Sequence, residues 1–132
     1  MNGNFDIDLD FGQIYEEKIR NIFEGKGGIE VKTERDMWKR TGNIAIEVRY
    51  KGNPSGLSST NADWWIHILS DNGEIDTAFM FKVNKLRKKI RRLVSRKEAR
   101  IVMGGDNSDS EIVLVPISKL SKVTKIRSNT HE

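Results

Sequence analysis

The stretch from Asp36 to Thr60 reads DMWKRTGNIAIEVRYKGNPSGLSST and decides the fold, because it joins a turn to an alternating strand. Residues 43–50 carry apolar side chains at every second position, namely Ile44, Ile46 and Val48. A period of two is typical of a strand that buries one face and exposes the other. We therefore predict a long extended segment at 29–40 that turns tightly and pairs with 43–50 as a hairpin.

The predicted hairpin brings Asp36, Glu47 and Arg49 onto one face of the sheet. With Thr41-Gly42 as the turn, Asp36 lies directly opposite Glu47. With Gly42-Asn43 as the turn, Asp36 lies opposite Arg49 and diagonal to Glu47. Directly opposite residues are about 4.5–5.5 Å apart at Cβ. Both registers place two carboxylates beside one guanidinium, which suits either a cation site or a simple exposed ion pair.

Length and composition predict one domain spanning 1–132, long enough to bury a core. The chain has no cysteine and only two histidines, which argues against a zinc site built on thiolates or imidazoles. Any metal would then be held by carboxylates, which favour Mg²⁺ or Mn²⁺. No apolar run reaches the length of a membrane span and the first residues lack a signal-peptide pattern, so we expect a cytoplasmic protein.

Positive charge is concentrated in residues 82–100, which hold ten bases and one acid, within a chain of net charge +4. Such a block indicates a polyanionic partner such as DNA, or a solvated helix face. We predict a helix at 84–95, capped by Asn84, with an apolar seam of Leu86, Ile90, Leu93 and Val94. Its candidate phosphate-binding residues are Lys85, Lys88, Lys89, Arg91 and Arg92.

The N-terminal segment has two patterns. Residues 5–11 alternate apolar and acidic side chains, which predicts a short strand or extended arm over 1–11. Residues 12–24 carry an apolar stripe at helical spacing, formed by Tyr15, Ile19, Ile22 and Phe23. Glu16 lies at the edge of this stripe, whereas its rival Glu17 points away from it. The glycines at 25, 27 and 28 end the helix.

The second half of the chain alternates strands and turns. Residues 52–56 are predicted to form a loop and 58–60 to lead into a cap or a strand. Asp71-Asn72-Gly73 predicts a hairpin turn into a strand at 77–83. Further strands are expected at 100–103 and 111–117, and a frayed tail at 118–132. Four residues of the tryptophan segment are assigned to the core: Trp64, Trp65, Ile66 and Ile68.

These residues resemble the PD-(D/E)XK nuclease superfamily, whose fold is restriction-endonuclease-like. The resemblance spans roughly residues 12–83 and rests on a helix with Gly12 and Glu16, followed by Asp36-x10-Glu47-x-Arg49. The stretch 41–47, with Pro54-Ser55-Gly56 and Ala62-Asp63-Trp64, is also similar to small phage proteins of this group. The resemblance implies an α/β (α+β) fold in which helices flank a central mixed sheet. It also implies hydrolysis of DNA phosphodiesters, including branched or junction DNA, by a homodimer.

Carried over residue by residue, the resemblance makes Asp36 and Glu47 metal ligands and Glu16 the helix acid that accompanies them. Arg49 stands where the superfamily has lysine. Because arginine stays protonated in proteins, Arg49 cannot act as a general base, although it can stabilise negative charge on a phosphate. Lys32 or Lys51 can supply the missing ammonium. Glu30-Val31-Lys32 is a second, literal match to Glu-x-Lys.

Two other functions remain open from the sequence. One is a nucleic-acid-binding module without catalysis, which uses the basic helix at 84–95 and leaves Asp36, Glu47 and Arg49 structural. The other is a protein-interaction or membrane-surface protein, although the helix seam lacks the aromatic residues that favour membrane insertion. Near the site, hydroxyl groups can bind phosphate or serve turns and caps: Ser55, Ser58, Ser59 and Thr60. We expect DNA as the partner, no small-molecule cofactor and no membrane.

Overall fold

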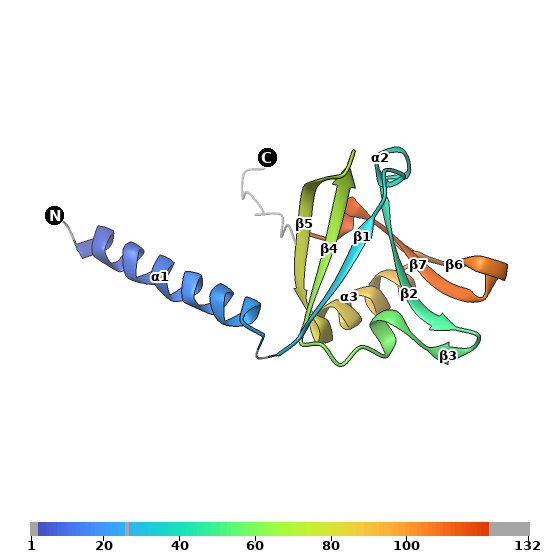
Figure 1. The fold of residues 1–132 in the computed structure, drawn as a ribbon, viewed down its shortest axis with the longest axis horizontal. Coiled ribbons are helices and arrows are strands. Elements are labelled where there is room, and N and C mark those ends of the chain that lie inside the picture. Colours follow the sequence, from blue (N-terminus) through green and yellow to red (C-terminus); the bar gives the residue numbers. More distant parts are fainter. Residues whose placement is uncertain (1–2, 26, 122–132) are drawn as a thin grey trace, which may run out of the picture.

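The computed structural model describes residues 3–25 and 27–121, with side chains from residue 10 onward. Within these ranges lie the helices α1 (Gly3–Phe23), α2 (Trp38–Thr41) and α3 (Val83–Ser95) (Figure 1). The strands are β1 (Ile29–Glu34), β2 (Asn43–Tyr50), β3 (Asn53–Pro54), β4 (Trp64–Asp71), β5 (Glu74–Lys82), β6 (Arg100–Gly104) and β7 (Ser110–Pro116). Single 3-10 turns are η1 (Gly56–Ser58), η2 (Asp106–Ser108) and η3 (Ile117–Lys119). The α+β class that the sequence predicts is confirmed.

One sheet has three strands in the order β1-β4-β5. β1 runs parallel to β4, from Ile29 beside Trp64 to Glu34 beside Leu69. β4 and β5 are antiparallel and meet at the hairpin turn predicted at 71–73. Asn72 and Gly73 both have positive φ angles, 51° and 82°, as the two central residues of a type I′ turn require. Strand β5 begins directly after this turn, three residues earlier than predicted.

The other sheet has four strands in the order β3-β2-β7-β6, all antiparallel. The strands predicted at 100–103 and 111–117 are confirmed as β6 and β7, and β7 pairs with β2 along most of its length. The resemblance implied one central mixed sheet, whereas the seven described strands divide between two sheets.

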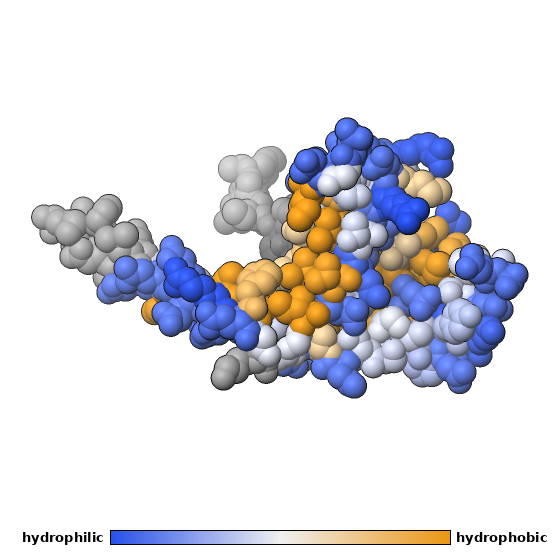
Figure 2. Space-filling view, in the orientation of Figure 1, coloured by the Kyte–Doolittle hydropathy of each residue, from blue (hydrophilic) through white to orange (hydrophobic). Residues whose placement is uncertain are grey.

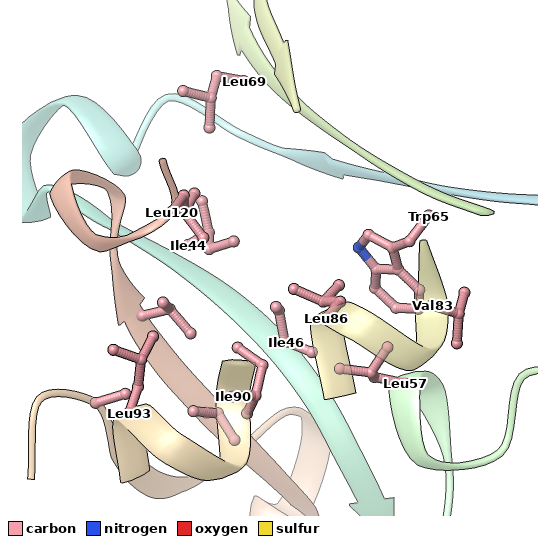
Figure 3. Close-up of a cluster of buried hydrophobic side chains, with 13 residues drawn as sticks. Ile44, Ile46, Leu57, Trp65, Leu69, Val83, Leu86, Ile90, Leu93 and Leu120 are labelled. Atoms are coloured by element: carbon pink, nitrogen blue, oxygen red, sulfur yellow. The ribbon is translucent and has the colours of Figure 1, made fainter. Parts of the chain in front are cut away.

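The hydrophobic core lies between α3 and the four-stranded sheet, and β4 closes it (Figure 3). The predicted alternation of β2 is confirmed, because Ile44 and Ile46 are both buried. The predicted seam of α3 is also confirmed, with Leu86, Ile90 and Leu93 buried and Val94 packed against them. The helix begins at Val83, however, so Asn84 lies inside its first turn and does not cap it. The N-cap position is Lys82, which makes no side-chain capping bond.

The hairpin predicted between 29–40 and 43–50 is wrong. The extended segment ends at Glu34, and α2 follows at Trp38–Thr41. Gly42 ends α2 in the left-handed region at φ 72°, and the Trp38 Nε1–H donates to the Ser70 carbonyl at 2.7 Å. The bond from Trp38 to Ser70 ties α2 to the end of β4. Strand β1 pairs with β4, and strand β2 pairs with β3 and β7.

Helix α1 leads away from the two sheets (Figure 1). The strand or arm predicted for 5–11 is wrong, since the backbone is helical from Gly3 to Phe23. The alternation covers only seven residues, and its last member, Phe11, contacts Tyr15 four positions later with ring centroids 4.7 Å apart. This i, i+4 contact belongs to a helix. The break predicted at 25–28 is confirmed, with Gly25 and Gly28 at positive φ.

The frayed tail predicted over 118–132 is wrong for its first residues. Residues 117–119 form η3 and Leu120 is buried in the core, so the tail does not begin at 118 as predicted. The remainder, 122–132, lies outside the described residues. Among the helices described, none combines the length and the apolar character that a membrane crossing requires.

Candidate functional site

A narrow cleft of about 260 Å³ lies between β1 and β2. It brings together two carboxylates and one ammonium, because its lining residues are Lys32, Thr33, Glu34, Ala45, Glu47, Gly56 and Trp65. Its volume is below the roughly 300–1,000 Å³ of typical small-molecule pockets. A cleft of this size holds a small group rather than a drug-sized organic ligand.

Glu34 is the most firmly held carboxylate of the cleft. Its Oε2 accepts a hydrogen bond from the Ala45 backbone N–H at 2.9 Å, and this bond connects β1 to β2. The same oxygen lies 2.6 Å from Nε2 of His67, whose side chain is 1% exposed. Both bonds use Oε2, so within the described residues Oε1 has no protein donor and remains available to a ligand.

The protonation of His67 follows from its second partner. The Trp65 indole N–H donates to His67 Nδ1 at 3.1 Å, and an indole nitrogen can only donate. Nδ1 must therefore carry the lone pair, which leaves the proton on Nε2, where it is donated to Glu34. The hydrogen-bonded chain of Trp65, His67 and Glu34 thus fixes the orientation of the carboxylate, as residues that hydrogen-bond a ligand side chain do at metal sites.

Glu47 enters the cleft from β2, at an irregularity in the pairing with β7 between Glu47 and Arg49. Its Oε1 accepts a hydrogen bond of 2.7 Å from the Ser110 hydroxyl. Turn η1 presses against its backbone: a Cβ at Gly56 would lie 2.1 Å from the Glu47 carbonyl oxygen, and Gly56 has φ 51°. Only glycine fits here, because a side chain meets both a clash and a left-handed conformation.

Lys32 supplies the ammonium of the cleft. It lies in register with His67 across β1 and β4, and its Nζ is 3.5 Å from a carboxylate oxygen of Glu30. Glu30 also accepts a hydrogen bond of 3.0 Å from the Thr60 hydroxyl. Glu30, Lys32 and Glu34 occupy alternate positions of β1 and therefore share one face of the strand. The Glu30-x-Lys32 pair of the second sequence interpretation is thus held together at the cleft.

The metal ligands predicted from the hairpin do not meet. Asp36 is exposed in the turn after β1 and does not line the cleft that Glu47 enters. Glu16 is exposed on α1, where it pairs with Arg20 at 3.7 Å, and Arg49 is exposed on β2. Among the side chains that the structure describes, those of residues 10–25 and 27–121, no group of three or more His, Cys, Asp or Glu is placed to hold a metal ion.

The environment of Asp36 is that of a surface charge. The Lys39 ammonium contacts Asp71, and this hydrogen bond, with lesser attraction from Asp71 and Asp36, raises the pKa of Lys39. Asp36 thus favours the charged form of Lys39, which lies in the following helix α2.

The basic face of α3 is solvent-exposed at four of the five predicted phosphate-binding residues: Lys85, Lys88, Arg91 and Arg92. The fifth, Lys89, is half-buried. Three of the lysines and Arg92 line a groove of about 420 Å³ beside Phe81 and Leu120. Arg87 has a different task, because its guanidinium donates to the carbonyls of Leu57 and Thr60, both at 2.8 Å.

The hydroxyl groups predicted near the site differ in exposure and in their hydrogen-bond partners. Thr60 is occupied by Glu30 and by the Ala62 N–H, which donates to it at 3.2 Å. Ser58 and Ser59 are exposed at and after η1. The Ser55 hydroxyl is buried without a hydrogen-bond partner among the described residues. The hydroxyl of Thr60 is therefore used by contacts within the protein, whereas Ser59 is exposed to solvent.

Sequence reasoning missed Glu34, which lines the cleft, and also His67 and Ser110, which hydrogen-bond the cleft carboxylates. Glu34 had a signal, since it continues the alternation Glu30-x-Lys32-x-Glu34 on one strand face. His67 also had one, because it alternates with Trp65 and Leu69, and a polar residue on a buried strand face needs a partner. Ser110 carries no local signal, since its contact with Glu47 joins residues 63 positions apart.

Comparisons of this chain with protein-family models, with curated proteins and with solved structures found no match. The similarity to PD-(D/E)XK nucleases therefore rests on the residues of the chain alone.

Proposed function

We propose that this chain is a divalent-metal-dependent endonuclease that hydrolyses phosphodiester bonds of DNA, with its centre in the cleft between β1 and β2. The observation that carries the proposal is that Glu34, Glu47 and Lys32 line one cleft. Two acids and a lysine are the set that the resemblance implies. In this proposal Glu34 replaces Asp36 as a metal ligand, and Lys32 replaces Arg49 as the positively charged residue.

The donor set of the cleft fits Mg²⁺ or Mn²⁺. Mg²⁺ commonly binds through one or two carboxylates and completes its shell with waters and substrate phosphates, so two acids suffice. Glu34 and Glu47 each use one oxygen for a protein hydrogen bond and retain another. A bound ion of this kind lowers the pKa of its water and screens the charge of the phosphodiester.

The protein residues have distinct tasks in this proposal. The Ala45 N–H and His67 hold the Glu34 carboxylate in place, and Ser110 holds that of Glu47. Lys32 offers a compact positive charge to the phosphate, stabilising the negative charge that grows during hydrolysis. Arg49 and Glu16 lie outside the cleft and take no direct part.

The basic face of α3 is the proposed contact for the DNA backbone, by phosphate contacts that weaken as salt rises. Turn η1 joins the two regions, since Gly56 lines the cleft and Leu57 and Ser58 line a groove with Arg87 and Arg91. A DNA strand can follow this turn from the helix to the cleft. One small chain covers little of a duplex, so we infer a homodimer. Because the proposed substrate is DNA, we also infer that the protein acts inside the cell.

The test is nicking of supercoiled plasmid and of branched DNA with Mg²⁺ or Mn²⁺, followed by chelation with EDTA. We expect Glu34→Gln and Glu47→Gln to reduce cutting to background while DNA binding persists. The matched control is Asp36→Asn, which removes a carboxylate two residues from Glu34 but outside the cleft and should cut normally. Loss of cutting in Asp36→Asn together with normal cutting in Glu34→Gln would overturn the proposed centre.

The second candidate is a DNA-binding module without catalysis. It is favoured by the finding that the described residues contain no group of three or more metal-ligating side chains. In that case α3 binds DNA in a salt-sensitive manner, and the cleft contacts are structural. Gel shifts without cleavage under Mg²⁺, Mn²⁺ or any other divalent ion would establish this function instead.

A further inference from the structure

The outer face of the three-stranded sheet is apolar and uncovered. Trp65, His67 and Leu69 of β4 point inward and are buried, so the alternate residues of β4 and their neighbours in register point outward. These outward residues include Val31, Ile66 and Met80 in one row and Ile68 and Ala78 in the next. Figure 2 shows a hydrophobic patch over β1, β4 and β5 that reaches toward the base of α1. The core prediction is confirmed for Trp65 but is wrong for Trp64, Ile66 and Ile68 in this chain alone, since these three are only half-buried.

Helix α1 carries a matching apolar surface. Along its described side chains, five large apolar residues are exposed at helical spacing: Phe11, Ile14, Tyr15, Ile19 and Phe23. Phe11 is 62% exposed and Phe23 is 59% exposed, so most of each aromatic side chain faces solvent in the single chain. An isolated amphipathic helix owes most of its stability in proteins to the packing of its apolar face. The stripe on α1 therefore needs a surface to cover it.

The described residues on both sides of the short connector between α1 and β1 make backbone hydrogen bonds. On the helix side, Glu24 and Gly25 donate backbone hydrogen bonds to Arg20 and Ile22, at 2.9 and 3.2 Å. On the sheet side, the carbonyls of Gly27 and Gly28 accept from the backbone N–H groups of Asp63 and Trp64, at 2.9 and 3.3 Å. Helix α1 leads away from its own sheet (Figure 1).

We propose that α1 of one copy packs its apolar stripe on the outer face of the three-stranded sheet of a second copy, and that the second copy returns the contact. Both surfaces lie on the same chain, so a reciprocal exchange closes into a two-fold dimer without leaving either surface open. The length of α1 matches that of the sheet face, because a 21-residue helix is about 30 Å long and strands of six to nine residues span about 20–30 Å.

The area agrees as well. From their exposed fractions, the rings of Phe11, Tyr15 and Phe23 alone offer about 250–430 Å² per copy, taking 150–250 Å² for a whole aromatic side chain. Reciprocal contact doubles this contribution, and the sheet face adds a comparable area. The total is then about 1,000–1,700 Å², a range that includes the roughly 1,200 Å² at which stable interfaces begin. A monomer that left both surfaces bare would expose more apolar area than the few hundred Å² that such proteins usually tolerate.

The test uses the absence of cysteine from the chain, which allows single thiols to be introduced. Ile19→Cys on α1 and Val31→Cys on the sheet are made in separate chains, one bearing a size tag, and the two are co-expressed. A flexible bis-maleimide should join one chain of each kind, and light scattering of the wild type should give twice the 15.1 kDa mass. The control pair is Glu17→Cys with Val31→Cys, because Glu17 lies on the opposite side of α1 from the stripe.

Two results would overturn the proposal. One is a wild-type mass of a single chain. The other is cross-linking of an Ile19→Cys/Val31→Cys double variant only within one chain, which would show that α1 folds back on its own sheet. As a second readout, Ile19→Glu should halve the mass while the circular dichroism of the sheets is retained; an unchanged mass counts against the contact. These measurements use neither DNA nor metal, so their outcome is separate from that of the proposed nuclease activity.

Discussion

The cleft between β1 and β2 and the basic face of α3 carry charge in opposite ways. In the cleft, hydrogen bonds from Ala45, His67 and Ser110 fix each carboxylate in one orientation. On α3, the exposed lysines and arginines project into solvent from a helix whose other side is core. Fixed charges suit chemistry, which needs defined positions, whereas mobile charges suit binding to a polyanion of varied shape.

Because their charges are held differently, the two regions should respond differently to substitution. Changes to the cleft carboxylates and to the residues that hold them should affect cutting and folding but leave the salt dependence of DNA binding unchanged. Changes on the exposed side of α3 should alter salt dependence and leave the rate of cutting at saturating DNA unchanged. Each prediction below either separates the two regions further or removes the distinction.

The largest effect is expected at Gly56→Ala. The added Cβ would meet the Glu47 carbonyl oxygen, at φ 51°, so we expect destabilisation of roughly 3 kcal/mol or more and loss of cutting. Gly52→Ala is the matched control, since Gly52 has φ 81° but no atom within 4 Å of the added Cβ. It should cost only about 1 kcal/mol. Urea denaturation compares the two, and equal losses would deny any special contact at Gly56.

His67→Leu is expected to act on both stability and cutting. It leaves the Trp65 indole N–H without an acceptor inside the core, at a cost of about 1–3 kcal/mol. It also frees the Glu34 carboxylate to rotate, which should lower kcat by about 10–100-fold. Denaturation monitored by tryptophan fluorescence and single-turnover kinetics measure the two effects. A variant that unfolds more easily but cuts at the normal rate would show that His67 is only structural.

The charges of α3 should divide into two kinds. Lys88→Ala and Arg92→Ala should each reduce the slope of log affinity against log salt by about 1, with kcat unchanged. Arg87→Ala should instead lower stability by on the order of 2 kcal/mol, because its guanidinium holds the carbonyls of Leu57 and Thr60. Fluorescence anisotropy over a salt series, with melting curves, checks both. An unchanged slope in Lys88→Ala and Arg92→Ala would remove α3 from the DNA-binding surface.

The smallest effect is expected at the surface pair Glu98–Lys119. A hydrogen bond from Lys119 at 3.0 Å, with its positive charge, lowers the pKa of Glu98. A carboxyl with a lowered folded-state pKa adds stability above its unfolded pKa, and loses it as the pH falls through the folded pKa. Lys119→Met should therefore be slightly less stable than wild type at neutral pH, and the difference should vanish in acid. Melting temperatures over a pH series test this; a difference that grows in acid would contradict the assignment.

The sequence predicted what local pattern determines. The alternation Ile44, Ile46 gave the buried face of β2, the spacing Leu86, Ile90, Leu93 gave the seam of α3, and Asn72-Gly73 gave the hairpin turn. The partner of β1 was wrong, because the choice between β2 and β4 is made by contacts such as that of Trp38 with Ser70. Glu34 was missed for the same reason, since its neighbours Ala45 and His67 come from two other strands.

The candidate site shows the same limit. Glu47 and Lys32 were found because each stands in a short acid-x-base pattern, whereas Asp36 was chosen only through the predicted hairpin. When that pairing is replaced, the carboxylate that reaches Glu47's cleft is two residues earlier in the chain. Local patterns therefore identified the kinds of residue required, and the strand pairing decided which of them meet.

The most direct test of the cleft is Mn²⁺ binding, followed by electron paramagnetic resonance of the free ion, with wild type and three variants in the presence of an uncleavable DNA. We predict one bound Mn²⁺ per chain in wild type and in Asp36→Asn, and binding weakened at least about tenfold in Glu34→Gln and Glu47→Gln. Undiminished binding in Glu34→Gln, or binding lost in Asp36→Asn, would contradict the account.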